Sequence, residues 1–352
     1  MSLRQRLAAL IAADGPLPVS AYMTLCLHDR QHGYYATRPG LGRDFITAPE
    51  TSQVFGELLG LWAGHEWQAM GAPDGLQLAE LGPGRGTLMA DALRAGTQVP
   101  GFAEAAALTL IEASPALRTV QGERLGAYRP RFGNDIAAIP AGPAVILANE
   151  YLDCLPARQF VRDGAGWRER VVGLDPKGEL SFGLATDRAP DGEVAVEGPG
   201  ATCEVQPALD VLVDQLAMRA EAGAPLRALF IDYGPAGHAP GDTLRAFREG
   251  VQVDPLAAPG ESDLTVDVDF SRLARLARAA GLSVHGPVEQ GAFLLALGAE
   301  ARLNQLAKAS PERAGALYDG VRKLVDPAEM GARFKVICLS SPGLPVPAGL
   351  AA

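Results

Sequence analysis

The stretch Leu76-Gln77-Leu78-Ala79-Glu80-Leu81-Gly82-Pro83-Gly84-Arg85-Gly86-Thr87 decides the fold. Its apolar run at 76–81 predicts a buried strand, and residues 88–94 place apolar side chains at helical spacing. A strand, a glycine turn and a helix make the first unit of a nucleotide-type α/β fold. Glycines suit the turn because a Cβ would keep the backbone away from a ligand.

The form of the glycine motif separates two classes of ligand. A dinucleotide fingerprint has glycines at its first, third and sixth positions, but here the sixth residue is Thr87 and the fifth is Gly86. Glu80 would repel a pyrophosphate and attract an ammonium. The pattern resembles motif I of class I S-adenosylmethionine (SAM) methyltransferases, so we favour SAM over NAD; a tight turn without a ligand is the alternative. The cofactor-binding candidates here are Glu80, Gly82, Pro83, Gly84, Gly86 and Thr87.

Polar residues follow the next two predicted strands. Glu112 comes directly after an apolar run at 107–111, at the point where nucleotide-type folds hold ribose hydroxyls. Ser114 is a candidate N-cap of the following helix and a further cofactor candidate. Asn134 and Asp135 end the third unit, where they could contact an adenine or simply form a polar turn.

An all-apolar run at 144–148 predicts a strand in the centre of the sheet. Asn149, Glu150 and Asp153 follow its C-terminal end, where open α/β sheets bind their ligands, and Asn149 is a further cofactor candidate. If the chain turns helical there, the two carboxylates share one face.

The first 72 residues predict a helical region. Helices are expected at 3–11, at 22–27 with Ser20 as N-cap, and at 53–69. The polar segment 45–52, which leads into the third helix, reads equally well as an elaborate N-cap or as a lid over cofactor or substrate. The second reading makes Thr47 and Gln53 further cofactor candidates.

Beyond the central strand, residues 157–205 alternate in polarity between turn residues and predict an antiparallel insertion. A Gly/Pro-rich excursion spans 237–269. The remaining expected elements are a helix at 207–221, a strand at 228–234, a helix at 270–280, a strand at 282–284 followed by an apolar run at 290–295, helices at 301–309 and 311–324, and a strand at 334–339. We expect three parts: a helical cap at 1–72, a sheet domain at 73–340 and a flexible tail at 341–352.

Composition narrows the class of protein. A net charge of -10 over 352 residues argues against nucleic acid as the partner. The four cysteines are far apart, which argues against disulfides and zinc and fits a reducing cytoplasm. His28 and His32 lack the Glu of a zinc-protease motif, so no metal is expected. No apolar run approaches the ~20 residues of a membrane span, and the start lacks a secretory signal.

Many short motifs along residues 17–340 resemble the MidA-like SAM-dependent methyltransferases. These are the bacterial relatives of the mitochondrial complex I assembly-factor arginine methyltransferase. The motifs are His32-Gly33-Tyr34-Tyr35, 44–50, 52–57, 80–89, Ser114-Pro115, Asn149-Glu150 with Asp153 and Leu155-Pro156, 231–234, 263–265, 268–270 and 334–336. The chain departs from the family at Asp267, where a histidine is usual, and at Tyr151-Leu152, where two aromatics are usual.

The resemblance implies a class I Rossmann-like α/β fold with a seven-stranded sheet, SAM as methyl donor, and an arginine-bearing protein substrate such as a respiratory complex I subunit. It implies the bacterial cytoplasm as location, and a homodimer is compatible with the sequence.

For the catalytic residues, the resemblance implies that Glu150 binds the substrate guanidinium, and that Asp153 supports Glu150 or contacts the cofactor. The alternative is that both carboxylates are capping groups. Two other functions stay open: a non-catalytic assembly factor that holds SAM, and a small-molecule methyltransferase. The insertion and the excursion favour a macromolecular substrate because they can build a binding surface.

Overall fold

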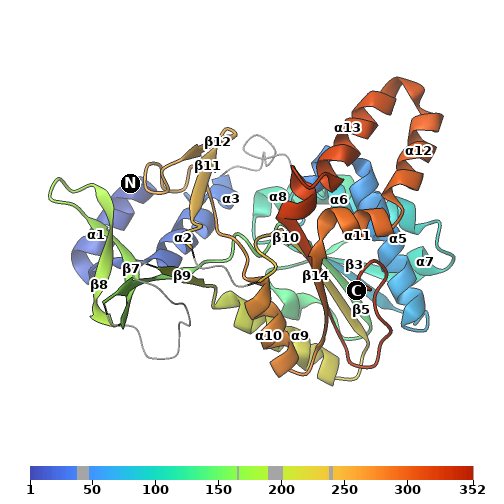
Figure 1. Cartoon of the computed structure of the whole chain (residues 1–352), viewed down its shortest axis with the longest axis horizontal. Helices are drawn as coiled ribbons and strands as arrows, with labels where there is room; N and C mark the ends of the chain where they lie inside the picture. The colour runs from blue at the N-terminus through green and yellow to red at the C-terminus, as the bar shows by residue number, and fades with distance from the viewer. Residues whose placement is uncertain (38–46, 165, 189–200, 238–240, 352) are drawn as a thin grey trace. The chain divides into compact units, whose positions relative to one another are not determined.

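The computed structural model describes residues 1–37, 47–164, 166–188, 201–237 and 241–351 (Figure 1). The chain divides into two compact units. Unit 1 contains residues 1–45, 153–210 and 238–267, and unit 2 contains 46–152, 211–237 and 268–352. This division differs from the expected one, because the helix at 53–69 belongs with the sheet and the insertion belongs with the N-terminal helices. Residues 45–46 of the suspected lid, and the loop before them, lie outside the described residues.

Unit 2 is built on a seven-stranded sheet with the order β14-β15-β10-β5-β2-β3-β4, which confirms the predicted α/β class. Five neighbouring strands are parallel, and β15 runs antiparallel to both β10 and β14. The strands are β2 (Leu76–Leu81), β3 (Ala106–Ile111), β4 (Arg131–Gly133), β5 (Ala144–Asn149), β10 (Leu226–Tyr233), β14 (Ser283–Glu289) and β15 (Phe334–Ser340).

The strand order reverses between β2 and β5. From β2 the chain proceeds outward to β3 and β4, and then returns to the other side of β2 as β5. Leu81 is paired with Ala148, so the carboxyl ends of the two strands lie side by side. Ligands of open α/β sheets bind at such a reversal.

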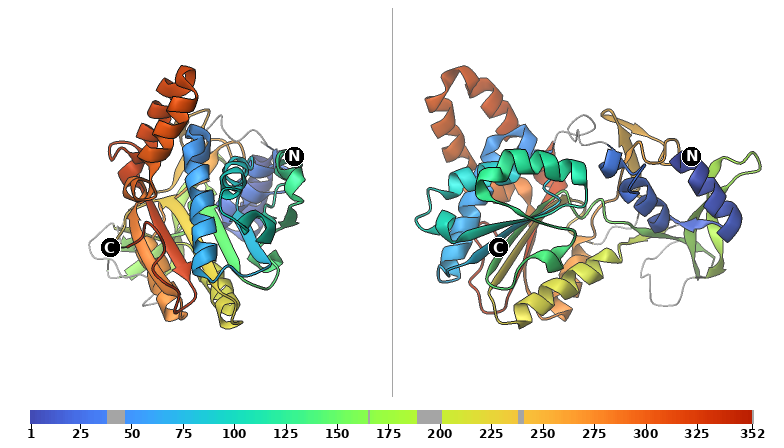
Figure 2. Two further views of the ribbon diagram at one scale, coloured as in Figure 1. Left: turned by 90° about the vertical axis from the view of Figure 1, so that its right-hand side faces the viewer. Right: turned by 180° about the vertical axis from the view of Figure 1, so that it is seen from behind.

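The longer helices of unit 2 agree with the periodicity of the sequence, whereas the four helices of seven residues or fewer were not predicted. Only α9 starts in unit 1 and continues in unit 2. The helices are α4 (Ala48–Thr51), α5 (Gln53–Ala69), α6 (Thr87–Gly96), α7 (Phe102–Ala105), α8 (Pro115–Leu125), α9 (Ala208–Glu221), α10 (Phe270–Ala279), α11 (Gln290–Ala296), α12 (Ala299–Ala309), α13 (Ala314–Val325) and α14 (Met330–Arg333). In Figures 1 and 2, α12 and α13 form a helical hairpin that projects from the sheet.

Helix α5 packs very closely on α6. A Cβ at Gly60 would lie 2.1 Å from the carbonyl oxygen of Ala92, and one at Gly56 would lie 2.9 Å from that of Leu88. The small residues let the two backbones approach, and Phe55 and Trp62 of α5 are buried in the core against the sheet. Burial of each such side chain contributes roughly 1.5–3 kcal/mol.

The end of the chain, which we expected to be a flexible tail, packs against unit 2. The indole N–H of Trp62 donates to the carbonyl oxygen of Ala348 at 3.1 Å, and the N–H of Ala348 donates to Glu66 at 2.9 Å. Glu66 is itself paired with the buried Arg227 at 3.0 Å, and Leu350 is buried. Residues 341–351 are therefore part of the packed fold.

Unit 1 confirms an antiparallel insertion. Its larger sheet contains β1 (Leu17–Pro18), β6 (Arg158–Asp163), β7 (Gly166–Leu174), β8 (Leu180–Arg188) and β9 (Thr202–Val205), and its helices are α1 (Leu3–Asp14), α2 (Val19–His28) and α3 (Tyr34–Thr37). None of the described helices in either unit is long and apolar enough to cross a membrane.

Three local predictions need correction. Helix α2 starts at Val19 with Pro18 as N-cap, so Ser20 lies inside the helix and does not cap it. The apolar run at 290–295, to which no element was assigned, forms helix α11. The excursion at 237–269 contains a small sheet of β11 (Arg245–Arg248), β12 (Val251–Val253) and β13 (Asp263–Thr265) that the sequence did not reveal.

Candidate active site

The glycine loop adopts the conformation that its sequence requires. Gly82, Gly84 and Gly86 have φ values of 62°, 53° and 73°, a region that favours glycine. Gly86 is the N-cap residue of α6, and Thr87 is the first residue of that helix. The N–H of Gly82 donates to the carbonyl oxygen of Ile111 at 3.0 Å, which fixes the loop at the ends of β2 and β3.

Glu80, near the end of β2, is a carboxylate in an apolar environment. Only 3% of its surface is exposed. Burial and the negative charge of Glu112 raise the pKa of Glu80 to about 8 from its ordinary value of 4.5. A cation placed beside Glu80 would reverse this shift, because it favours the ionised form.

Glu112 follows β3, as predicted, and is connected to the glycine loop through a residue that the sequence analysis missed. It accepts hydrogen bonds from the N–H of Ser114 at 2.7 Å and from Gln121 Nε2 at 3.2 Å. Burial raises the pKa of Glu112, and these hydrogen bonds partly counter that effect. Gln121 also donates to the carbonyl oxygen of Gly84 at 2.7 Å. It was detectable in the sequence as a polar residue in the apolar row of Leu117 and Leu125.

Ser114, Asn134 and Asp135 all have local structural partners. Ser114 caps α8, as predicted, by accepting from the N–H of Leu117 at 3.4 Å. Asn134 accepts from Arg118 at 2.7 Å, and Asp135 accepts from the N–H of Ala137 at 2.9 Å. Both of the last two residues are exposed, which fits the polar-turn reading.

Glu150 stands at the C-terminal end of β5 in an unusual backbone conformation. Its φ is 52°, in the left-handed region that non-glycine residues rarely occupy. Its N–H donates to the carbonyl oxygen of Ile231 at 2.9 Å, and its Oε1 accepts from Asn149 Nδ2 at 2.9 Å and from the N–H of Ala48 at 3.3 Å. Such conformations concentrate at functional sites, where the surrounding structure holds them.

The turn after Glu150 is held by Asp232, a second residue that the sequence analysis did not assign. Asp232 is 0% exposed and lies on the neighbouring strand β10. Its Oδ2 accepts from the N–H groups of Tyr151 at 3.1 Å and Leu152 at 2.8 Å. The chain forms a turn here and no helix, so the condition for a shared helical face of Glu150 and Asp153 is not met.

Asp153 belongs to unit 1, where it joins the small sheet. Its Oδ2 accepts from the Thr265 hydroxyl at 2.8 Å, and its carbonyl oxygen accepts from the N–H of Val266 at 3.0 Å. Both partners belong to the excursion at 237–269, so Asp153 links that excursion to the chain segment that follows the central strand.

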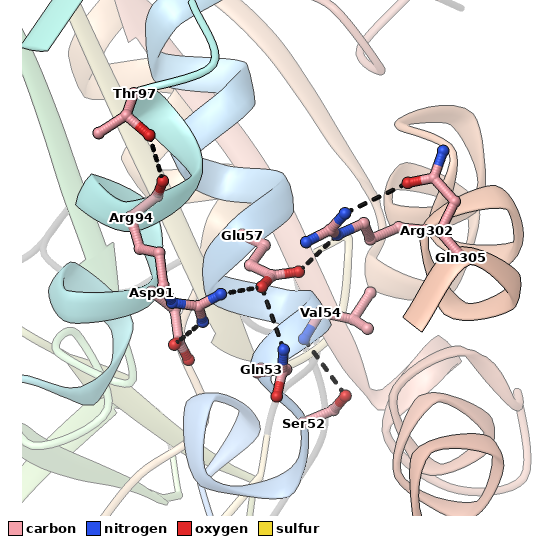
Figure 3. A network of polar contacts seen from close by, with 9 residues as sticks. All are labelled: Ser52, Gln53, Val54, Glu57, Asp91, Arg94, Thr97, Arg302 and Gln305. Atoms are coloured by element: carbon pink, nitrogen blue, oxygen red, sulfur yellow. Dashed lines mark hydrogen bonds and ion pairs between the residues drawn. The ribbon is translucent and has the colours of Figure 1, made fainter. Parts of the chain in front are cut away.

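The segment around α4 touches two parts of the site. The N–H of Ala48 contacts Glu150, and Glu50 lies 3.9 Å from Arg85 of the glycine loop. Ser52 caps α5 by accepting from the N–H of Val54, so the N-cap predicted within the segment 45–52 is Ser52. Thr47 is the N-cap residue of α4 but makes no side-chain capping bond. Gln53 donates to Glu57 at 3.1 Å (Figure 3).

Three buried side-chain oxygens, two near the carboxyl ends of β2 and β5 and one on α8, have no donor among the described residues. No described residue donates a hydrogen bond to Glu80 Oε2, Gln121 Oε1 or Asn149 Oδ1. A ligand that carries an ammonium and hydroxyl groups, such as SAM, could donate hydrogen bonds to these acceptors. A pyrophosphate offers only acceptors and negative charge, so the donor set of the site does not suit it.

Comparisons with known proteins agree with this chemistry. A family model described as "Putative S-adenosyl-L-methionine-dependent methyltransferase" matches residues 58–288. "Protein arginine methyltransferase NDUFAF7 homolog, mitochondrial" of Drosophila melanogaster is 38% identical over 373 residues, covering 96% of this chain and 84% of the relative. "Protein arginine methyltransferase NDUFAF7, mitochondrial" of Homo sapiens is 37% identical over 361 residues, covering 94% of this chain and 81% of the relative.

Two solved structures share the fold over almost the whole chain. A protein from Burkholderia thailandensis bound to S-adenosyl-homocysteine has a TM-score of 0.84 and 29% identity, covering 99% of this chain and 93% of its own. A native crystal structure from the same organism has a TM-score of 0.84 and 28% identity, covering 99% and 94%.

Proposed function

The chain belongs to the family of SAM-dependent methyltransferases that includes the mitochondrial arginine methyltransferases, and we propose that it methylates arginine side chains of a protein substrate. The use of SAM as methyl donor is supported by the family and by the buried oxygens of Glu80, Gln121 and Asn149, to which no described residue donates. The choice of arginine rests on the names of the relatives and on the geometry of Glu150.

The observation that carries the proposal is the placement of Glu150. A half-buried carboxylate sits in a left-handed backbone conformation next to Asn149, one of the candidate cofactor residues. Backbone strain costs free energy of about 1–3 kcal/mol and persists only where surrounding contacts enforce it. Asp232, Asn149 and Ala48 provide those contacts.

SAM, when bound, supplies an electrophilic methyl carbon on a sulfonium. Glu80 would hold its cationic methionine end and Glu112 its ribose hydroxyls. Glu150 would pair with the substrate guanidinium, which is a poor nucleophile while its charge is fully delocalised. A carboxylate beside it localises the charge on one side and fixes the orientation of the remaining nitrogen. Positioning of this kind can contribute several kcal/mol to methyl transfer.

Asp153 is our second candidate carboxylate, for contact with the substrate or the cofactor. The antiparallel insertion and the small sheet of unit 1 offer surface for a macromolecular substrate, and we propose a respiratory complex I-type subunit. The four cysteines are free, in keeping with a reducing bacterial cytoplasm. A non-catalytic SAM-binding assembly factor and a small-molecule methyltransferase are the competing functions.

The test is to incubate the purified protein and methyl-labelled SAM with extract of the native cell from which its gene has been deleted. We expect label in one or few proteins, with mono- or dimethylarginine identified by mass spectrometry. Label only in small molecules would favour the second competing function. SAM binding without any transfer to the native extract would favour the first.

A further inference from the structure

A buried carboxylate outside the cofactor site connects three helices of unit 2. Glu57 of α5 is 0% exposed, yet it is surrounded by donors (Figure 3). Arg302 of α12 donates from Nε to Glu57 Oε2 at 2.6 Å, Arg94 of α6 donates to Oε1, and Gln53 donates to Oε1 at 3.1 Å. Burial would raise the pKa of Glu57, but the hydrogen bonds from Arg302 and Arg94 leave it below its ordinary value.

The hairpin that carries Arg302 also contacts the junction between α4 and α5. A Cβ at Gly320 of α13 would lie 2.7 Å from the carbonyl oxygen of Thr51 and 3.3 Å from Ser52 Cβ. The backbone of α13 is therefore in direct contact with the last residue of α4 and with the N-cap of α5. Gly320 thus contacts the junction itself, and Arg302 contacts the first turns of α5 at Glu57.

The same junction reaches Glu150. Residues Ala48–Thr51 form a single turn of helix whose first N–H donates to Glu150 Oε1 at 3.3 Å. A displacement of α4 moves this donor directly, since Ala48 is only three positions along the chain from Thr51, which contacts Gly320. The path from the hairpin to Glu150 is therefore short: Gly320 contacts the backbone of Thr51, and the N–H of Ala48 contacts the Glu150 carboxylate.

We propose that the α12–α13 hairpin braces the α4–α5 junction, and that Arg302, acting through Glu57, is a positioning residue for Glu150. This inference rests on the proposed role of Glu150 in methyl transfer. It assigns a role in that reaction to a hairpin that contributes no residue to the candidate cofactor site described above. Arg302 does not touch Glu150, so its effect should fall on the geometry of the reaction and not on SAM binding.

The experiment compares Arg302→Gln with Arg302→Lys and with a matched control, Arg322→Gln. Arg322 lies on the same hairpin, but its ion pairs with Asp326 and Glu329 are exposed. Three quantities are measured on each purified full-length variant: hydrogen exchange of the Ala48 and Ala79 amides by NMR, affinity for S-adenosyl-homocysteine by calorimetry, and single-turnover methyl transfer. Gly320→Ala is a second perturbation of the brace, should Arg302→Gln fail to fold.

For Arg302→Gln we expect a larger acceleration of exchange at Ala48 than at Ala79, because Ala79 lies in the central sheet and reports only the general loss of stability. Methyl transfer should fall about tenfold, while S-adenosyl-homocysteine affinity stays within about twofold. Arg302→Lys should restore most of the rate, since it keeps a charge beside Glu57, and Arg322→Gln should match the wild type. Gly320→Ala should repeat the Arg302→Gln pattern.

Equal acceleration at Ala48 and Ala79 would mean a general loss of stability and would overturn the positioning role. Unchanged exchange at Ala48, or normal methyl transfer despite faster exchange there, would overturn it as well. If the wild-type protein itself methylates no arginine, the proposed function fails, and the exchange data still decide whether the hairpin holds α4.

Discussion

Replacement of Glu80 by Gln should change how SAM binding depends on pH. In the unliganded protein, burial and the charge of Glu112 raise the pKa of Glu80 to about 8. At about pH 7, roughly nine-tenths of the molecules therefore carry a proton on Glu80. If the ammonium of SAM pairs with the carboxylate, that proton must leave when SAM binds.

The size of the expected pH dependence of SAM binding follows from the raised pKa of Glu80. Ionising Glu80 at about pH 7 costs about 1.4 kcal/mol, one pKa unit of free energy. Binding should release about 0.9 protons at about pH 7, and affinity should increase with pH by close to a factor of ten per unit between about pH 5.5 and 7. The ammonium of SAM stays charged in this range because free α-amino groups titrate near pH 8.

The assay is calorimetry of SAM binding in buffers with different enthalpies of ionisation. The dependence of the apparent enthalpy on the buffer gives the number of protons released. Wild type should release close to one proton, and Glu80→Gln should release few and bind SAM with little pH dependence. Glu112→Gln is the comparison variant: it removes the smaller cause of the raised pKa of Glu80 and leaves burial, the larger one, so it should keep most of the release. Equal proton release by wild type and Glu80→Gln would refute the pairing of Glu80 with the cofactor.

The remaining perturbations address stability and affinity. Between pH 4.5 and about 8 the folded state holds a proton on Glu80 that the unfolded state lacks. The free energy of unfolding, measured by urea titration, should therefore fall by about 2 kcal/mol between about pH 5.5 and 7. The fall should be smaller in Glu80→Gln. Glu112→Ala should weaken SAM binding by about 1–3 kcal/mol in calorimetry; lost stability with unchanged affinity would make Glu112 a structural cap. Asp232→Asn should destabilise the fold by about 1–3 kcal/mol in urea titrations, because buried N–H groups lose their acceptor, and a variant as stable as wild type would contradict this.

Much of the fold could be predicted because its signals are local. Helix α5 spans Gln53–Ala69, as its periodicity predicts, and β2 matches its apolar run. The run at 290–295 could not be assigned in the same way, since a short apolar segment suits a buried strand as well as a helix. The two units could not be predicted because each is assembled from separate segments of chain.

In the candidate site, too, the residues with local sequence signals could be predicted and the others could not. Glu112 and Glu150 follow apolar runs and Glu80 lies near the end of one, so their places at strand ends could be predicted from the sequence. Gln121 and Asp232 could not be assigned, because their roles depend on partners that are distant in the chain: Gln121 lies 37 residues from Gly84, and Asp232 lies 80 residues from Leu152. The positive φ of Glu150 depends on such contacts too.

Single-turnover methyl transfer by Glu150→Gln tests the central claim most directly. The substitution keeps the shape of the side chain and removes its charge. With the arginine-bearing substrate identified from the native extract, we expect SAM affinity close to that of wild type and a methyl-transfer rate lower by two or more orders of magnitude, which corresponds to about 3 kcal/mol of transition-state stabilisation. A rate close to that of wild type would contradict the claim and leave Glu150 as a structural residue at the end of β5.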